Sequence, residues 1–312
     1  MNLFLSIDEL NNLPWRESAV AVGTFDGVHR GHQAVIRRAI EDAQAYNRAS
    51  VVFTFDRHPT EIVRSESSPP YLCTLQQRIQ FIKELNVDNI VVLPFTKEFS
   101  QITADTFSID ILKERLKCSH LVVGEDFRFG LGGTGSVTYL QNNASQFGFE
   151  VTPVATVCEK SVRISSTRIR EAIALGDLAI AEELLGRRFL YSGSVVKGHS
   201  LGRTMGFPTA NLVPVTNLAL PADGIYATTA ELHGDVYAGA CSIGMRPTRG
   251  GTERTVEVYL IDYDGADIYG ATIDLTFIKR LRDQWKLSGL EQLKEQIEKD
   301  VDEVRDVLGG VI

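Results

Sequence analysis

The sequence predicts a doubly wound α/β domain with a parallel sheet, followed by a small β-barrel domain with a terminal helix. The chain has 312 residues, which is long for one hydrophobic core, and its 44% hydrophobic and 23% charged residues are typical of globular proteins. The pattern of apolar residues also changes near Arg187, from strands alternating with helices to strands alone. We therefore expect domains at residues 1–186 and 187–312.

In the first domain, five short apolar runs each precede a longer amphipathic segment, which is the pattern of a parallel sheet. The predicted strands are AVAVG, VVFTF, NIVVLPF, HLVVG and VTPVATV, at residues 19–23, 51–55, 89–95, 120–124 and 151–157. The predicted helices begin at Gly31, and at residues 74, 104, 136 and 166, with a further short helix at 177–187. Ligands of such sheets lie beyond the carboxyl ends of the strands, so site residues are expected at 23–32, 56–59 and 125–130.

The second domain is predicted as strands joined by glycine, proline and Asp-Gly turns, which favours a small barrel. Two hairpins are expected, one pairing 224–232 with 236–244 and one pairing 255–262 with 268–278 across the Asp264-Gly265 turn. The leucine and isoleucine spacing between residues 287 and 308 predicts a terminal helix packed on the barrel.

Composition narrows the class of ligand. The formal net charge of −8 provides no general attraction to nucleic acid or to an anionic membrane, so a small ligand is expected. The N-terminal segment shows no targeting signal and no long apolar run, so a cytoplasmic location is expected. The widely spaced cysteines indicate no metal site or disulfide and are expected to be buried: Cys73, Cys118, Cys158 and Cys241. The oligomeric state is not determined, and a weak homo-oligomer stays open.

The most informative motif is GTFDGVHRGH at residues 23–32, directly after the first predicted strand. Gly23 and Gly27 permit a close approach of the backbone to a ligand. His29 and His32 stand three residues apart where the next helix begins, so both imidazoles face one side. A helix N-terminus presents unpaired amide groups and a positive dipole end. We interpret the motif as a polyphosphate site, although either histidine alone would fit an ordinary polar residue at a helix start.

GTFDGVHRGH resembles the H-x-G-H signature of the adenylyl- and cytidylyltransferase superfamily, and ISSTRIR at 164–170 resembles the second signature, I-S-S-T-x-I-R. With FDRHP at 55–59 and GEDFRFG at 124–130, the set is similar to the FMN adenylyltransferase module of bacterial bifunctional riboflavin kinase/FAD synthetases. The resemblance implies a Rossmann-like nucleotidyltransferase domain. The implied ATP contacts are Gly23, Phe25, Gly27, His29, His32, Ser165, Ser166, Thr167 and Arg168. The implied flavin contacts are Phe55, His58, Pro59, Asp126, Phe127, Arg128 and Phe129.

The same residues have readings that do not depend on the family. The three hydroxyl residues 165–167 are N-cap candidates, and Arg168 is a guanidinium that could bind an anion or lie on a solvated surface. Pro59 keeps His58 out of the helical region. Phe127 and Phe129 would also fit ordinary loop packing.

The glycines at 130, 132 and 135 match G-x-G-x-x-G, a dinucleotide fingerprint. Their context differs from that of the fingerprint in two ways. Charged residues separate the glycines from the preceding strand, and Glu150 stands at the start of the next strand, whereas the fingerprint has an acidic residue at the end of that strand. A flexible flap beside the aromatic loop is the preferred interpretation. An NAD-dependent oxidoreductase is kept as an alternative.

Residues 193–212 combine glycines, cations and a Pro-Thr-Ala-Asn run, which alone would indicate a glycine-rich hairpin, since the Gly-Lys-Ser/Thr ending of a Walker loop is absent. GFPTANL at 206–212 resembles the signature of the riboflavin kinase domain. The resemblance implies that Thr209 and Asn211 hold Mg-ATP and act as metal ligands. The implied ATP contacts in this domain are Gly198, Gly202, Arg203, Thr209 and Asn211.

Glu257 interrupts the apolar strand TVEVYLI, on the face shared by Tyr259 and Ile261. A carboxylate there is costly without a partner or a task, and a strand with a wet outer face stays the alternative. In the family, the glutamate at this position is the general base that activates the riboflavin 5′-hydroxyl. Adenylyl transfer needs no such base because the FMN phosphate is already anionic, so His29, His32 and Arg168 are expected to align it and stabilise charge.

The resemblance extends from Gly23 to the terminal helix and implies a bifunctional enzyme. Riboflavin and ATP would give FMN and ADP, and FMN and ATP would then give FAD and pyrophosphate, with Mg²⁺ as the cofactor. Arg249, Tyr259 and Trp285 depart from the residues common in the family, which puts the riboflavin contacts in doubt. A non-catalytic flavin-binding protein is the second alternative.

Overall fold

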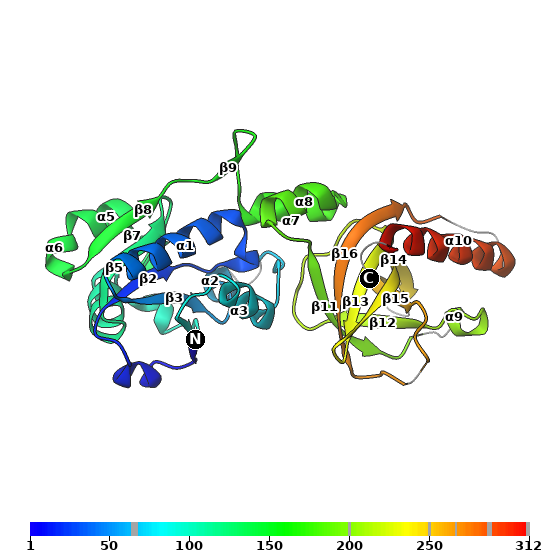
Figure 1. The fold of residues 1–312 in the computed structure, drawn as a ribbon, viewed down its shortest axis with the longest axis horizontal. Helices are drawn as coiled ribbons and strands as arrows, with labels where there is room; N and C mark the ends of the chain where they lie inside the picture. The colour runs from blue at the N-terminus through cyan, green and yellow to red at the C-terminus, as the bar shows by residue number, and fades with distance from the viewer. Residues whose placement is uncertain (64–67, 199–200, 249–250, 266, 286–288, 310–312) are drawn as a thin grey trace. The chain divides into compact units, whose positions relative to one another are not determined.

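The computed structural model describes residues 1–63, 68–198, 201–248, 251–265, 267–285 and 289–309 (Figure 1). Contacts divide the chain into two compact units, Met1–Pro69 with Leu75–Ser166, and Pro70–Thr74 with Thr167–Ile312. By their contacts, the last two helices before residue 187, at Ser166–Leu175 and Leu178–Leu185, therefore belong almost entirely to the second unit. The predicted boundary at residue 187 stays a prediction.

The first unit contains a six-stranded sheet, in the order β1-β4-β3-β2-β5-β8, in which every pair of neighbours is parallel. Its strands are β1 (Asn2–Phe4), β2 (Ser18–Val22), β3 (Ala49–Phe55), β4 (Asn89–Leu93), β5 (Cys118–Gly124) and β8 (Glu150–Val154). The five predicted strands are confirmed. The sequence pattern did not indicate β1, a short edge strand that pairs with β4.

The central strands form because they are buried on both faces, so their apolar runs are continuous. All five residues of β2 and of β4 are buried. Val20 and Val22 belong to a core cluster with Phe107 and Leu112, and alternation directs Ala19 and its equivalents to the opposite face, where α1 packs.

Helices follow the strands along the chain. They are α1 (Arg30–Ala45), α2 (Pro59–Val63), α3 (Leu75–Lys83), α4 (Ala104–Thr106), α5 (Val137–Asn142), α6 (Ala144–Phe147), α7 (Ser166–Leu175) and α8 (Leu178–Leu185). The predicted helix at 104–116 continues beyond α4 as wide π turns over Phe107–Arg115, where the Leu116 N–H donates to the Ile111 carbonyl five residues back.

The strand order places a crevice at the carboxyl ends of β2 and β5. The chain proceeds from β2 to β3 and β4 on one side and then returns to add β5 on the other side of β2. At such a reversal the connections leave in opposite directions, which opens a ligand site. The loops after β2 and β5 contain two of the predicted motifs.

The glycine-rich segment after β5 forms a small hairpin, not a strand-to-helix turn. Strand β6 (Arg128–Phe129) pairs with β7 (Gly135–Ser136), and Gly130 and Gly132 adopt positive φ angles of 71° and 65° between them. A Cβ on Gly135 would lie 2.5 Å from the Phe129 ring. The glycines thus serve the turn and its packing, which is not the frame of a dinucleotide fingerprint.

The second unit contains a closed antiparallel barrel in the order β11-β12-β15-β14-β13-β16, which confirms the predicted barrel. Its strands are β11 (Leu190–Val196), β12 (Thr209–Pro214), β13 (Gly224–Leu232), β14 (Asp235–Thr248), β15 (Gly251–Leu260) and β16 (Thr272–Arg282). The first predicted hairpin is confirmed as β13 and β14, joined through His233 and Gly234 with φ angles of 54° and 92°.

The second predicted hairpin is wrong. Strand β15 pairs with β12 and β14, whereas β16 pairs with β11 and β13. Gly265 does adopt a positive φ of 83°, but both edges of β15 and of β16 are occupied by other strands. The Asp-Gly signal therefore did not determine which strands pair.

The predicted terminal helix is confirmed as α10 (Leu290–Leu308). Its buried residues Val301, Val304 and Leu308 form a cluster with Ala227 and Ile261 on the outside of the barrel. A short helix, α9 (Leu201–Thr204), lies between β11 and β12.

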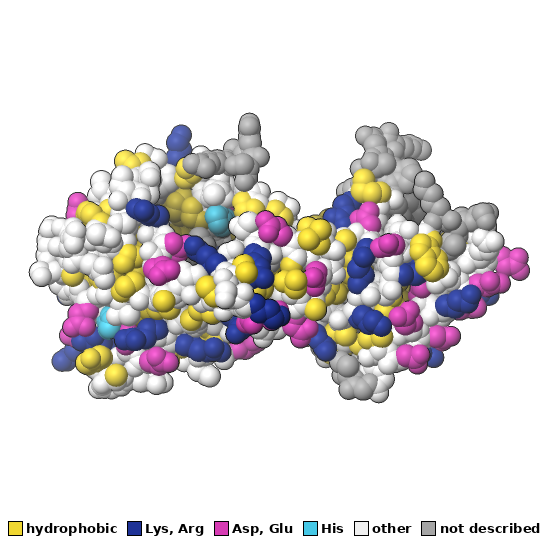
Figure 2. Space-filling model, turned by 90° about the horizontal axis from the view of Figure 1, so that it is seen from above, with side chains coloured by type: hydrophobic (Ala, Val, Ile, Leu, Met, Phe, Trp, Pro, Cys, Tyr) yellow, Lys and Arg dark blue, Asp and Glu magenta, His cyan; other side chains and the backbone are white. Residues whose placement is uncertain are grey.

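Three of the four cysteines are buried as expected, namely Cys73, Cys118 and Cys241, but Cys158 is exposed. Cys158 opens β9 (Cys158–Glu159), which pairs only with β10 (Val162–Arg163), so no second layer covers it. In the described chain, no helix has the length and apolar character needed to cross a membrane. Figure 2 shows acidic and basic side chains interspersed on the face seen from above.

Candidate functional site

The loop after β2 has an unusual backbone. Phe25 and Val28 adopt positive φ angles of 49° and 41°, and Gly27 has a φ of 76°. Positive φ is rare for a β-branched residue, so Val28 is strained. Gly23 is required for space, because a Cβ there would lie 2.9 Å from the Phe25 ring. The two predicted glycines thus serve different needs: one allows the chain to bend and the other admits a neighbouring ring.

His29 and His32 lie together at the start of α1. Their rings are stacked, with centroids 3.6 Å apart and planes 18° apart, in agreement with the expectation that they face one side. His29 is the N-cap residue, and its Nδ1 accepts a hydrogen bond from the His32 N–H at 3.3 Å. In the neutral imidazole, this bond places the ring proton of His29 on Nε2.

A cavity of about 340 Å³ lies against these histidines, in the crevice defined by the strand order. Nine of the predicted residues line it: Gly23, Phe25, His29, His32, Ser165, Ser166, Asp126, Phe127 and Arg128. The Ser166 hydroxyl also donates to the Asp26 carbonyl at 3.3 Å. The structure therefore brings the first signature, the two serines of the second signature and part of the aromatic loop to one cavity.

Other predicted residues of this domain lie away from the cavity wall. Phe55 packs in the core against Phe95 and Phe99, and Phe129 stacks on Phe127 while contacting Phe107. His58 Nδ1 accepts from the Thr60 N–H at 3.2 Å, as a cap of α2, whose first residue is Pro59. Gly27, Thr167 and Arg168 do not line the cavity.

The cavity wall also includes charged residues that the motifs did not single out. Arg163, on β10, lines the cavity and forms an ion pair with Asp126 of the aromatic loop. On the paired strand β9, Glu159 forms an ion pair with Arg30 of α1. The hairpin of β9 and β10 is thus held to both sides of the cavity. In the sequence, these two ion pairs were indicated only by the charges of Glu159 and Arg163, just before ISSTRIR.

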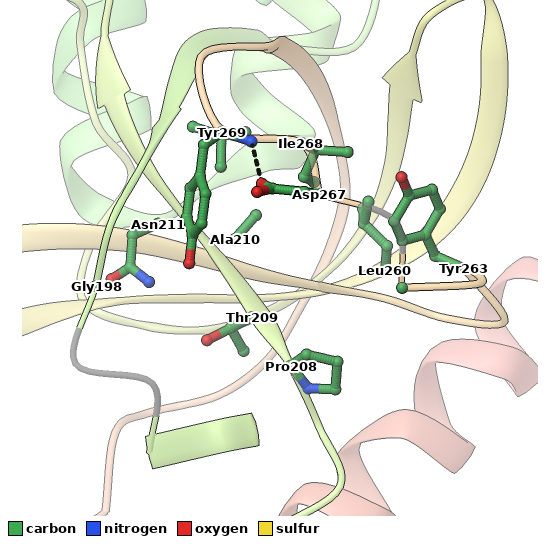
Figure 3. A pocket seen from close by; sticks show the side chains of 12 residues that line it. Gly198, Pro208, Thr209, Ala210, Asn211, Leu260, Tyr263, Asp267, Ile268 and Tyr269 are labelled. Atoms are coloured by element: carbon green, nitrogen blue, oxygen red, sulfur yellow. Dashed lines mark hydrogen bonds between the residues drawn. The ribbon is translucent and has the colours of Figure 1, made fainter. Parts of the chain in front are cut away.

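A second cavity, of about 220 Å³, lies in the barrel unit (Figure 3). Three predicted residues line it, namely Gly198, Thr209 and Asn211. Asp267, Ile268 and Tyr269, from the loop between β15 and β16, also line it. Figure 3 shows Asn211, Thr209 and Tyr269 around the same space, with the Asp267 carboxylate accepting the Tyr269 N–H at 3.1 Å.

Glu257 stands beside this cavity. It is half-buried on β15, where its register partners are Asn211 on β12 and Ser242 on β14. The Thr209 hydroxyl donates to Glu257 Oε2 at 3.3 Å. Ser242 in turn accepts from the Gln284 side chain at 3.0 Å, a residue that no motif included. The predicted Glu257 carboxylate, Thr209 hydroxyl and Asn211 amide therefore lie together on two paired strands, β12 and β15, and Ser242 extends this polar row onto β14.

The remaining predicted residues of the barrel unit have other surroundings. Gly202 leaves room for the chain to turn, because a Cβ there would lie 2.3 Å from the Phe207 carbonyl. Tyr259 packs edge-on against Phe207, and Trp285 is exposed with Arg282 over its ring at 4.6 Å. Arg249 and the side chain of Arg203 lie outside the described part of the chain.

Two cavities, each lined by residues of a predicted nucleotide motif and each in its own unit, agree with a chain of two nucleotide-dependent transferase domains. Family models agree with this division: residues 12–168 match FAD synthetase and residues 185–308 match riboflavin kinase. The chain belongs to the family of bifunctional riboflavin kinase/FMN adenylyltransferases.

Relatives with this double name cover nearly the whole chain. The protein of Escherichia coli strain K12 is 38% identical over 310 residues, which is 99% of this chain and 98% of the relative. The Haemophilus influenzae protein is 37% identical and covers 91% of this chain and 92% of its own length. The Bacillus subtilis protein is 36% identical, with 92% and 91% covered.

A solved structure supports the fold of both domains. The crystal structure titled macrolide-efflux protein from Streptococcus pneumoniae matches with a TM-score of 0.82 and 33% identity, covering 95% of this chain and 96% of that one. Its title assigns efflux to that protein. For this chain, both family models and the relatives named above agree on flavin chemistry.

Proposed function

We propose that the cavity of the first unit adenylylates FMN and that the cavity of the barrel phosphorylates riboflavin, with residues of this chain in the roles described below. The observation that supports this division is the contrast between the two sites. The first holds two stacked histidines at a helix start, and the second holds a half-buried carboxylate bonded to a hydroxyl.

In adenylyl transfer, an oxygen of the FMN phosphate attacks the α-phosphorus of ATP, and the bond to the departing pyrophosphate breaks. The nucleophile is already anionic, so the site has to align the reactants and stabilise charge. His29 and His32 supply ring donors, and the first turn of α1 supplies backbone amides. Ser165 and Ser166 lie across the same cavity, and Arg168 follows them in the sequence.

In the kinase reaction, the neutral 5′-hydroxyl of riboflavin attacks the γ-phosphorus, and the bond to departing ADP breaks. In this proposal Glu257 accepts the hydroxyl proton, and the hydrogen bond that Thr209 donates to it supports this role by orienting the carboxylate. ATP occupies the cavity beside Thr209 and Asn211, so that its γ-phosphate lies near Glu257.

Mg²⁺ fits the donors of the kinase site. Thr209 and Asn211 offer a hydroxyl and an amide oxygen, which are hard ligands. Among the described residues, no group of three His, Cys, Asp or Glu side chains could hold a metal by itself. Mg²⁺ usually binds one or two protein groups together with substrate phosphates, so this arrangement suits it, and the ion would neutralise developing charge on the phosphates.

Two substitutions test the division. His32→Ala should abolish FAD formation from FMN and leave the phosphorylation of riboflavin intact, whereas Glu257→Gln should stop FMN formation while supplied FMN is still converted to FAD. Chromatography of the flavin products with riboflavin or FMN, ATP and Mg²⁺ measures both steps. Each variant serves as the folding control for the other, because one activity persists in each. Loss of both activities in each folded variant would refute the two-site assignment.

A further inference from the structure

Arg78 is a buried cation next to the nucleotide loop, outside every sequence motif. It lies on α3 and is 3% exposed. Its guanidinium donates to the Thr24 carbonyl at 2.6 Å and to the Asp56 carbonyl at 3.1 Å. Thr24 belongs to the loop after β2 and Asp56 to the loop after β3. One side chain therefore fastens two predicted site loops to each other.

The position requires a specific donor. Among the described residues, no carboxylate forms an ion pair with Arg78, whose hydrogen bonds end on the two backbone carbonyls. A buried charge without a counterion is costly, so a neutral side chain would be the more stable choice if the position only had to be filled. The planar guanidinium has several donors in a rigid fork, which allows it to reach both carbonyls at once.

The loop that Arg78 holds is strained. Phe25 and Val28, which follow Thr24, have φ angles of 49° and 41°. Such conformations persist only where surrounding contacts over-determine the backbone. The Thr24 carbonyl also accepts from the Thr54 hydroxyl at 3.1 Å, so two donors fix it. Because the peptide is planar and trans, fixing this carbonyl also directs the N–H of Phe25 away from Arg78.

We propose that Arg78 is a positioning residue for adenylyl transfer. By holding the Thr24 and Asp56 carbonyls, it fixes the strained loop after β2 to the end of β3, so that the phosphates of ATP are aligned with the attacking FMN phosphate. Arg78 acts through the backbone and touches no substrate. This inference rests on the assignment of adenylyl transfer to the first cavity.

The test compares Arg78→Gln and Arg78→Lys with a control, Arg37→Gln, at an exposed position on α1. We expect Arg78→Gln to lower the kcat for FAD formation about 10- to 100-fold, with a much smaller change in the KM for ATP, because a misplaced loop impairs alignment more than binding. Arg78→Lys should recover only part of this loss, since a lysine is a point donor. Riboflavin phosphorylation and the control should remain at the wild-type rate.

A second variant keeps the buried charge. Thr54→Val removes the other donor to the Thr24 carbonyl, and we expect a smaller loss of the same kcat, about 2- to 10-fold. If circular dichroism shows that Arg78→Gln does not fold, Thr54→Val tests the proposal in its place. FAD formation within about twofold of wild type in folded Arg78→Gln, or in Thr54→Val when Arg78→Gln is unfolded, would overturn the proposal. Equal losses of both activities would assign Arg78 to stability alone. Retained FAD formation in His32→Ala would instead refute the underlying site assignment.

Discussion

Gly198 leaves the space that the Asn211 side chain occupies in the kinase cavity. A Cβ at position 198 would lie 2.2 Å from Asn211 Nδ2 and 2.4 Å from its Cγ. Non-bonded heavy atoms repel strongly at these distances, so the amide would have to move. Because Asn211 faces Glu257 across the β12 and β15 register, such a movement would disturb the proposed nucleotide site.

We therefore predict that Gly198→Ala raises the KM for ATP in riboflavin phosphorylation about 10-fold or more, through displacement of the Asn211 amide. Steady-state kinetics of FMN formation measure the effect, and FAD formation from supplied FMN should be unchanged. Gly289→Ala is the matched control, since Gly289 has extended backbone and a Cβ there would have no heavy atom within 4 Å. An unchanged KM for ATP in Gly198→Ala would contradict this role of the glycine.

Burial also changes the pKa of a single residue, Cys118, and with it the pH dependence of stability. Desolvation in the core raises the pKa of its thiol to about 12, and backbone bonding and nearby cations offset this only in part. A thiol whose folded pKa is raised stabilises the fold fully below its unfolded pKa, near 8.5, and this contribution is lost as pH rises towards the folded pKa.

The free energy of unfolding should accordingly fall between about pH 9 and pH 11, with Cys118 contributing a slope of up to about 1.4 kcal/mol per pH unit. Urea denaturation across this range should give a shallower slope for Cys118→Ala than for wild type. Cys158→Ala, at the exposed cysteine, is the control and should keep the wild-type slope. Identical slopes in all three proteins would show that Cys118 does not titrate on unfolding in this range.

At the scale of elements, a buried ion pair joins α10 to the end of β16. Arg282 donates to both oxygens of Asp300, at 2.8 and 2.6 Å, and the two side chains are 14% and 7% exposed. Gln296 donates to the same carboxylate at 2.9 Å. The apolar face of α10 holds the helix on the barrel, and this bidentate pair determines where the helix lies along it.

Asp300→Asn should destabilise the barrel unit by about 3 to 5 kcal/mol, because it leaves the Arg282 charge buried without its counterion. Urea unfolding monitored by circular dichroism, together with loss of kinase activity at lower urea than adenylyltransferase activity, measures this. Glu298→Gln is the control on the same helix: its partner Lys294 is 3.9 Å away and both are 53% exposed, so we expect less than about 1 kcal/mol. Equal effects of the two substitutions would contradict the role of the buried pair.

At the scale of the whole molecule, each unit has its own core, and the family models match the two parts of the chain separately. Residues 167–186 precede the predicted boundary in the sequence, but by their contacts they belong to the barrel unit. A Cβ on Gly176 would lie 3.1 Å from Arg280 of β16, whose guanidinium donates to the Asp223 carbonyl at 2.7 Å. The end of α7 therefore packs closely on the barrel.

Two fragments test the boundary. We expect residues 187–312 to fold and phosphorylate riboflavin, and residues 167–312 to do so with a higher Tm, because α7 and α8 bury surface on the barrel unit. Calorimetry and product chromatography make the comparison, with the full chain as reference. An unfolded 187–312 fragment beside a folded 167–312 fragment would move the boundary to the start of α7. Equal Tm values would show that these helices add no stability.

Much of the fold followed from local patterns in the sequence. Continuous apolar runs predicted the five central strands of the first unit, alternation and turn residues predicted the β13 and β14 hairpin, and helical spacing predicted α10. Such patterns can be recognised in the sequence because the side chains on the buried face of a helix or strand recur with the period of that element. The position of the motifs that follow strands could also be predicted, because the carboxyl ends of parallel strands lie at one edge of a sheet.

The sequence by itself determined the domain classes, the motifs at the two sites and, through resemblance, the chemistry. Only the tertiary structure decided that β15 pairs with β12 and β14, that Phe55 and Phe129 lie in the core, that Cys158 is exposed and that Arg78 joins two site loops. The reason is physical. The period of apolar residues indicates which face of a helix or strand is buried, and this depends on the local sequence alone. Strand partners and cavity walls depend instead on contacts between segments that are far apart in the chain.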